Sequence, residues 1–139
     1  MTADKQAMLP NKPSALLRLA VEDSQRIEVT PGYELDMRIW HNSRAGGPCR
    51  VCMAGSVMVH RLGVARLRHA TPESFDEETR CALVLIDDMR GGDFSGVGLN
   101  ADLAYRAGVA VTAAYFVRIG RADWSAYLRV ADMLEEAGF

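Results

Sequence analysis

Apolar residues recur at helical spacing over most of this chain, and they are most concentrated between Gly46 and Gly63. Pro48 stands where the first residue of a helix is expected, and Gly63 stands where a left-handed residue would end one. At about 100° per residue, one arc of the segment is apolar, and Arg50 and Arg61 lie on the opposite side. The pattern predicts one buried helix that the rest of the chain packs around.

The N-terminal third predicts a tail, a helix and then a β element. Residues 1–12 contain few apolar groups and are expected to be a frayed tail. A helix is predicted after them, with Ser14 as its N-cap. Apolar and charged residues alternate from Tyr33 to Trp40, which is typical of a strand, and Pro31-Gly32 suits a type II turn. Residues 27–29 are then either the first arm of a small hairpin or coil.

A helix ending at Arg90 is predicted in the middle of the chain. Ser74 and Glu77 have the spacing of a capping box, acidic residues follow in the first turn, and Gly91-Gly92 would end the helix. A competing interpretation takes residues 81–86 as a buried parallel strand. We favour the helix because the cap, the acidic first turn and the glycine stop agree.

Two more helices are predicted towards the C-terminus. Asn100 would cap one that runs to about Arg118, and Asp123 would cap the other. Together these elements predict a mainly α fold, with four to five helices round a central buried helix and a small β-hairpin or short strand. An α+β fold is the alternative.

Composition indicates one globular domain over residues 1–139, since 49% of the residues are hydrophobic and 24% are charged. The net charge is −2, but residues 1–70 carry a net +4 and residues 71–139 a net −6. Such a division is typical either of a basic surface for an anionic partner or of two halves that attract each other. We favour mutual attraction.

The three cysteines and the first residues indicate a reducing compartment. An odd number of cysteines does not make a disulfide framework. The N-terminus lacks the apolar run of a signal peptide, and the apolar stretch 107–117 is too short to cross a bilayer. We therefore expect a cytoplasmic protein without a membrane partner.

The Cys-x-x-Cys of Cys49 and Cys52 is the main candidate for chemistry. Thiols at the N-terminus of a helix lie near its positive end, the arrangement that redox enzymes use. A zinc site would need further ligands, which His41 and either Cys81 or His60 could supply. A single Cys-x-x-Cys is also typical of small buried hydrophobic residues, the interpretation that we favour. No cofactor or catalytic residue is therefore predicted, with zinc as the alternative.

A basic connector follows the central segment and is the candidate for nucleic-acid binding. Arg61, Arg66 and Arg68 could contact phosphate groups. The isoelectric point of about 5.9 and the lack of interleaved aromatic residues argue against that role.

Two segments carry a resemblance to a group of proteins. They are Tyr33-Glu-Leu-Asp-Met-Arg-Ile-Trp-His41 and Cys49-Arg-Val-Cys-Met-Ala-Gly-Ser-Val-Met58. Over residues 30–92 or so, the chain resembles short uncharacterised bacteriophage and prophage proteins, which usually have leucine and alanine where Met53 and Ser56 stand here. The resemblance implies a phage or prophage accessory protein, and it brings no activity with it.

Taken together, the sequence predicts a non-catalytic protein that acts by binding another protein. The alternatives are zinc or thiol chemistry at Cys49 and Cys52, and weak nucleic-acid binding through residues 61–69. The predicted helix after Asn100 has little polar surface and would suit a contact in a homo-oligomer.

Overall fold

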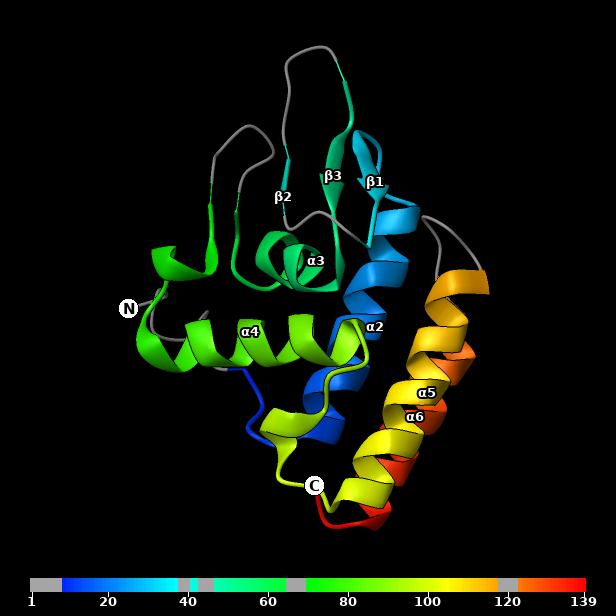
Figure 1. Ribbon diagram of the computed structural model, residues 1–139. Coiled ribbons are helices and arrows are strands. Elements are labelled where there is room, and N and C mark those ends of the chain that lie inside the picture. Colours follow the sequence, from blue (N-terminus) through cyan, green and yellow to red (C-terminus); the bar gives the residue numbers. More distant parts are fainter. Residues whose placement is uncertain (1–8, 38–40, 43–46, 65–69, 118–122) are drawn as a thin grey trace.

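The computed structural model describes residues 9–37, 41–42, 47–64, 70–117 and 123–139. Within these ranges the fold is mainly α with a small sheet, as predicted (Figure 1). The α-helices are α2 (Pro13–Glu28), α3 (Met53–His60), α4 (Glu77–Arg90), α5 (Ala101–Val117) and α6 (Trp124–Glu136). The strands are β1 (Tyr33–Leu35), β2 (His41–Asn42) and β3 (Cys49–Val51), and the 3-10 turns are η1 (Pro72–Ser74) and η2 (Ser95–Val97).

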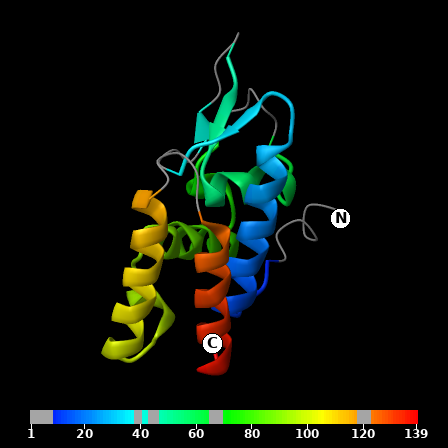
Figure 2. The ribbon, with the colours of Figure 1, turned by 90° about the vertical axis from the view of Figure 1, so that its right-hand side faces the viewer.

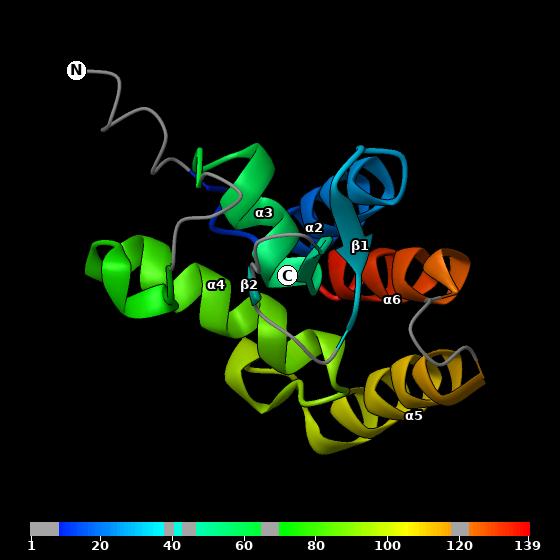
Figure 3. The ribbon, with the colours of Figure 1, turned by 90° about the horizontal axis from the view of Figure 1, so that it is seen from above.

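Three long helices stand side by side, with α6 between α2 and α5 (Figure 2). Helix α4 crosses beside this layer, and α3 lies between α4 and the sheet (Figures 1 and 3). Helix α3 also packs on α2. Because neighbours cover α3 on several sides, every residue from Met53 to Met58 is buried.

The sheet has the order β1-β3-β2. Strand β1 is parallel to β3, with Tyr33 opposite Cys49, and β2 is antiparallel to β3, with His41 opposite Val51. The predicted strand from Tyr33 to Trp40 is thus confirmed over Tyr33–Leu35, and it is wrong at residues 36 and 37, which lie beyond the end of β1. Positions 38–40 lie outside the described residues.

The predicted hairpin between residues 27–29 and the strand at Tyr33 is wrong, and the alternative of coil holds only for Val29, the C-cap of α2. Residues 27 and 28 belong to the last turn of α2, because the apolar face of that helix continues to the fully buried Ile27. Gly32 has φ 84°, so the expected turn forms, but it joins a helix to a strand.

The central segment contains a strand and a helix, and the prediction of one helix from Pro48 is wrong. Cys49–Val51 is the middle strand of the sheet, and α3 begins only at Met53. Pairing with β1 and β2 satisfies this backbone on both sides, so tertiary contacts override the helical pattern. The expected burial of the helix is confirmed, as is the left-handed glycine that follows it, Gly63 with φ 73°.

Helix α4 is confirmed over residues 81–86, so the alternative of a parallel strand is wrong. Its N-cap, however, is Asp76, whose side chain accepts a hydrogen bond from the Thr79 amide at 2.8 Å. The predicted cap, Ser74, belongs to η1, where its hydroxyl accepts from the Thr71 amide at 3.2 Å. Asp76 directly precedes the first helical residue, Glu77, whereas Ser74 lies two positions earlier in η1.

Of the three other predicted N-caps, two are confirmed and one is wrong. The Asn100 side chain accepts from the Leu103 amide at 2.8 Å, and Asp123 accepts from the Ser125 amide at 3.1 Å, as predicted. Ser14 is not a cap, because α2 already begins at Pro13 and Ser14 is buried. A proline fits the first helical position since its missing N–H would have no partner there. Of the predicted tail, residues 1–8 lie outside the described ranges and Leu9 packs on the core.

Candidate functional site

The two central cysteines are buried thiols on adjacent elements. Cys49 begins β3 and Cys52 is the N-cap of α3, and they are 0% and 1% exposed. Burial raises the pKa of the Cys52 thiol to about 11, because the thiolate would lose its hydration. The backbone N–H groups of Gly55 and Ala54 favour the thiolate, as expected at a helix N-terminus, but burial outweighs them. Cys52 is therefore protonated at neutral pH.

Two of the other candidate zinc ligands, His60 and Cys81, lie at the far end of α3 and on α4. His60 lies at the far end of α3, roughly 12 Å along the helix axis from Cys52. Cys81 is exposed on α4, and the side chain of His41 lies outside the described residues. Among the residues that the structure describes, no three His, Cys, Asp or Glu side chains form a group that could hold a metal.

Arg61 joins α3 to α2 through two carboxylates. Its Nε donates to both oxygens of Asp23, at 3.1 and 3.0 Å, and its Nη2 donates to Glu22 at 2.5 Å. Asp23 is fully buried, and burial raises the pKa of its carboxyl even though Arg61 opposes the shift. Of the basic candidates, Arg61 is thus engaged within the fold, and Arg66 and Arg68 lie outside the described residues.

His60 ends α3 beside this cluster. Its Nε2 is buried, and it has no hydrogen-bond partner in the described part of the chain. The Ser56 hydroxyl, one turn earlier, donates to the carbonyl oxygen of Cys52 at 2.8 Å. A hydroxyl that bonds its own helix in this way is typical of structural packing.

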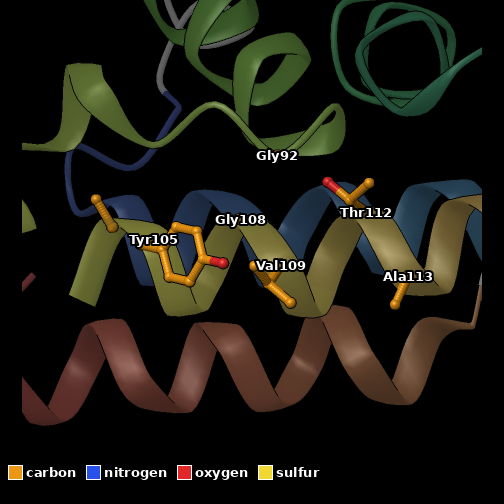
Figure 4. Close-up of a pocket in the computed structure, with 7 residues that line it drawn as sticks. Gly92, Tyr105, Gly108, Val109, Thr112 and Ala113 are labelled. Atoms are coloured by element: carbon orange, nitrogen blue, oxygen red, sulfur yellow. The ribbon is translucent and has the colours of Figure 1, made fainter. Parts of the chain in front are cut away.

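An apolar groove of about 500 Å³ runs along the outer side of α5 (Figure 4). Three consecutive turns of α5 line it together with the loop after α4, through Gly92, Ala104, Tyr105, Gly108, Val109, Thr112 and Ala113. Tyr105 is 72% exposed and Val109 is 50% exposed. Large apolar side chains this open, next to a groove, are typical of a binding surface.

Two glycines form the floor of the groove. A Cβ on Gly108 would lie 2.6 Å from the Gly92 carbonyl oxygen, and a Cβ on Gly92 would lie 2.6 Å from Thr112 Oγ1. Gly92 also has φ 94°, a conformation that glycine adopts readily. The two backbones therefore meet without side chains between them, and the space beside them stays open.

The groove was not predicted from the sequence, although two signals for it were present. The first is a helix that carries only two charged residues, Asp102 and Arg106, in its 17 positions. The second is a glycine inside that helix, which often marks close backbone approach. The sequence did not indicate which residue Gly108 approaches, because that residue, Gly92, lies sixteen positions earlier.

Comparison of the chain with known protein families, with curated proteins and with solved structures gives no match. In the described ranges, none of the helices has the length and apolar character needed to cross a membrane.

Proposed function

We propose that this chain is a non-catalytic phage or prophage accessory protein that acts in the host cytoplasm by binding a protein through the groove of α5. The observation that carries the proposal is the groove itself, with Tyr105 and Val109 open beside a floor of backbone. The resemblance of residues 30–92 to phage and prophage proteins supports the origin.

The two alternative functions, zinc or thiol chemistry and nucleic-acid binding, have less support. Thiol redox chemistry needs a thiolate, and burial raises the pKa of the Cys52 thiol to about 11. A zinc site needs ligands that converge, and among the residues that the structure describes no three His, Cys, Asp or Glu side chains do so. Nucleic-acid binding through residues 61–69 would use Arg61, which two carboxylates of α2 already hold.

The test is site-specific photo-crosslinking in the natural source cells. A photoreactive residue at position 109 is compared with one at position 84, since Val84 is a similarly open valine on α4. We expect a discrete covalent adduct with one protein at position 109 and none at position 84.

Two results would overturn the proposal. One is the same pattern of adducts at both positions, which would mean that α5 is not a binding surface. The other is stoichiometric zinc in the purified protein that is lost in Cys49→Ser, which would move the function to the cysteines.

A further inference from the structure

The exposed face of α5 has a regular pattern of side-chain size. Ala101, Tyr105, Val109 and Ala113 follow one another at a spacing of four, and all four are exposed. They span about 18 Å of helix. Such rows of residues at i and i+4 form the ridges that interdigitate when two helices pack.

We propose that the protein bound in the groove is a second copy of this chain, with the two α5 helices antiparallel about a two-fold axis beside Val109. This inference rests on the proposed function, because it uses the same surface. A two-fold contact brings the same patch of both copies together, so residue i meets residue j and j meets i.

The side chains of this exposed row differ in size, and in the antiparallel arrangement the two rows are complementary to each other. With Val109 at the axis, each Tyr105 faces Ala113 of the other copy, so the largest side chain meets the smallest. In a parallel arrangement the two tyrosines would meet each other, and the alanines would leave a gap.

The groove has space for the second copy's tyrosine ring. Its floor at Gly92 and Gly108 carries no side chain, and its volume is about 500 Å³. The hydroxyl of Thr112 lies at this floor, close to Gly92. Buried tyrosine hydroxyls usually find a polar partner, and Thr112 offers one.

Charge also favours an identical partner over a charged peptide. Asp102 and Arg106, the only charged residues of α5, pair with each other at 3.1 Å from Nε to Oδ2. The exposed row Ala101, Tyr105, Val109 and Ala113 carries no charged side chain that an acidic or basic segment could use. Two copies, each with a net charge of only −2, would meet across it with little repulsion.

The size of the contact sets its expected strength. Specific interfaces bury about 1,200–2,000 Å² in total, and a contact made by a single helix of each copy is a small one on that scale. Two tyrosines supply a large part, since each aromatic side chain buries about 150–250 Å². We therefore expect a reversible dimer that dissociates on dilution.

Disulfide trapping tests the arrangement residue by residue. In a Cys81→Ser background, Val109→Cys should form a covalent dimer when copper phenanthroline and oxygen are added. Tyr105→Cys mixed with Ala113→Cys should crosslink faster than either variant alone. Glu136→Cys, an exposed position on α6, reports random collision.

Sedimentation of the purified chain tests the dimer without a crosslink. We expect the mass to rise from 15.2 kDa towards twice that value with concentration. Val109→Asp should weaken dimerisation at least about tenfold, because the contact would bury a charge. Val84→Asp, the matched change on α4, should leave dimerisation unchanged, and circular dichroism should show both variants folded.

Three outcomes would overturn the inference. The first is a mass of 15.2 kDa at all concentrations. The second is disulfide formation in Val109→Cys that is no faster than in Glu136→Cys. The third is faster disulfide formation in Tyr105→Cys alone than in the mixture of Tyr105→Cys with Ala113→Cys. If the protein crosslinked to position 109 in cells is a different chain, the second copy is wrong and the proposed function stands. If neither position 109 nor sedimentation shows a partner, both fail.

Discussion

The chemistry of single residues in this fold depends on what covers them. Cys52 is at a helix N-terminus, where a thiol can become reactive, yet the surrounding core raises its pKa to about 11. Cys81 is exposed on α4. The sequence placed Cys52 near a helix N-terminus, but inside a helix from Pro48 rather than at the N-cap of α3. Its burial depends on α2 and α4, which are distant in sequence. Proximity to a helix start was therefore predictable, and reactivity was not.

Thiol labelling checks this difference. With an aromatic disulfide reagent at neutral pH, we expect one fast-reacting thiol per folded chain, at Cys81, and three after unfolding in urea. Cys81→Ser should abolish the fast reaction, because Cys49 and Cys52 react only when the core opens. Fast labelling that persists in Cys81→Ser would show that the central thiols are accessible.

Asp23 makes stability depend on pH in an unusual direction. Burial raises its pKa in the folded protein above the ordinary aspartate value of 3.8, against the attraction of Arg61, His60 and Arg26. The folded state therefore binds the proton more tightly than the unfolded state, so protonation of this group stabilises the fold. Its favourable contribution is complete below 3.8 and is lost as the pH rises through the folded pKa.

The comparison of wild type with Asp23→Asn isolates that contribution. As the pH is lowered from about 7 to about 4, the free energy of unfolding of wild type should rise relative to that of Asp23→Asn. Glu22→Gln, which removes an exposed carboxylate from the same Arg61, controls for the loss of charge. Denaturant titrations at several pH values measure all three. A difference that shrinks on acidification would show that the ion pair with Arg61 outweighs burial.

At the level of elements, helices with local signals at both ends were predictable. Asn100 and Asp123 cap α5 and α6 as expected, and α4 ends at the glycines. Strand β3 was not predictable, because its three residues are held by partners elsewhere in the chain. The groove depends in the same way on the meeting of Gly92 and Gly108.

Gly108→Ala tests that meeting. Alanine favours a helix by about 1 kcal/mol over glycine, but its Cβ would lie 2.6 Å from the Gly92 carbonyl oxygen. Overpacking of this kind costs about 1–3 kcal/mol, and backbone cannot move aside as a flexible side chain can. We expect a net loss of about 1 kcal/mol in the free energy of unfolding, measured in urea.

Gly96→Ala is the matched control, because its Cβ would lie 3.6 Å from Leu85 Cδ1, an ordinary contact. It should leave stability nearly unchanged. A Gly108→Ala protein that is more stable than wild type would mean that α5 and the loop after α4 separate freely, and the floor of the groove would then be adjustable.

At the scale of the whole molecule, the order of the helices leaves α5 at an edge. Helix α6 lies between α2 and α5, so α5 is covered on one side by α6 and above by the loop at Gly92 (Figures 2 and 4). Helix α5 nevertheless carries only two charged residues, Asp102 and Arg106, in its 17 positions, and its row Ala101, Tyr105, Val109 and Ala113 is exposed. A second copy on its open side would make α5 an interior helix.

The dependence of thermal stability on concentration follows from this arrangement. A partner that binds only the folded state stabilises it by mass action, so the Tm of a dimer rises with protein concentration. We expect the Tm of wild type to rise as the protein concentration is raised from about 1 µM to about 1 mM. These concentrations match the dissociation constants of a weak dimer, whose binding free energy is roughly 8 to 4 kcal/mol. Val109→Asp should have the lower Tm of a monomer at every concentration, whereas Val84→Asp should follow wild type. Scanning calorimetry at matched concentrations measures all three, and a wild-type Tm that is independent of concentration would leave α5 exposed in the folded protein.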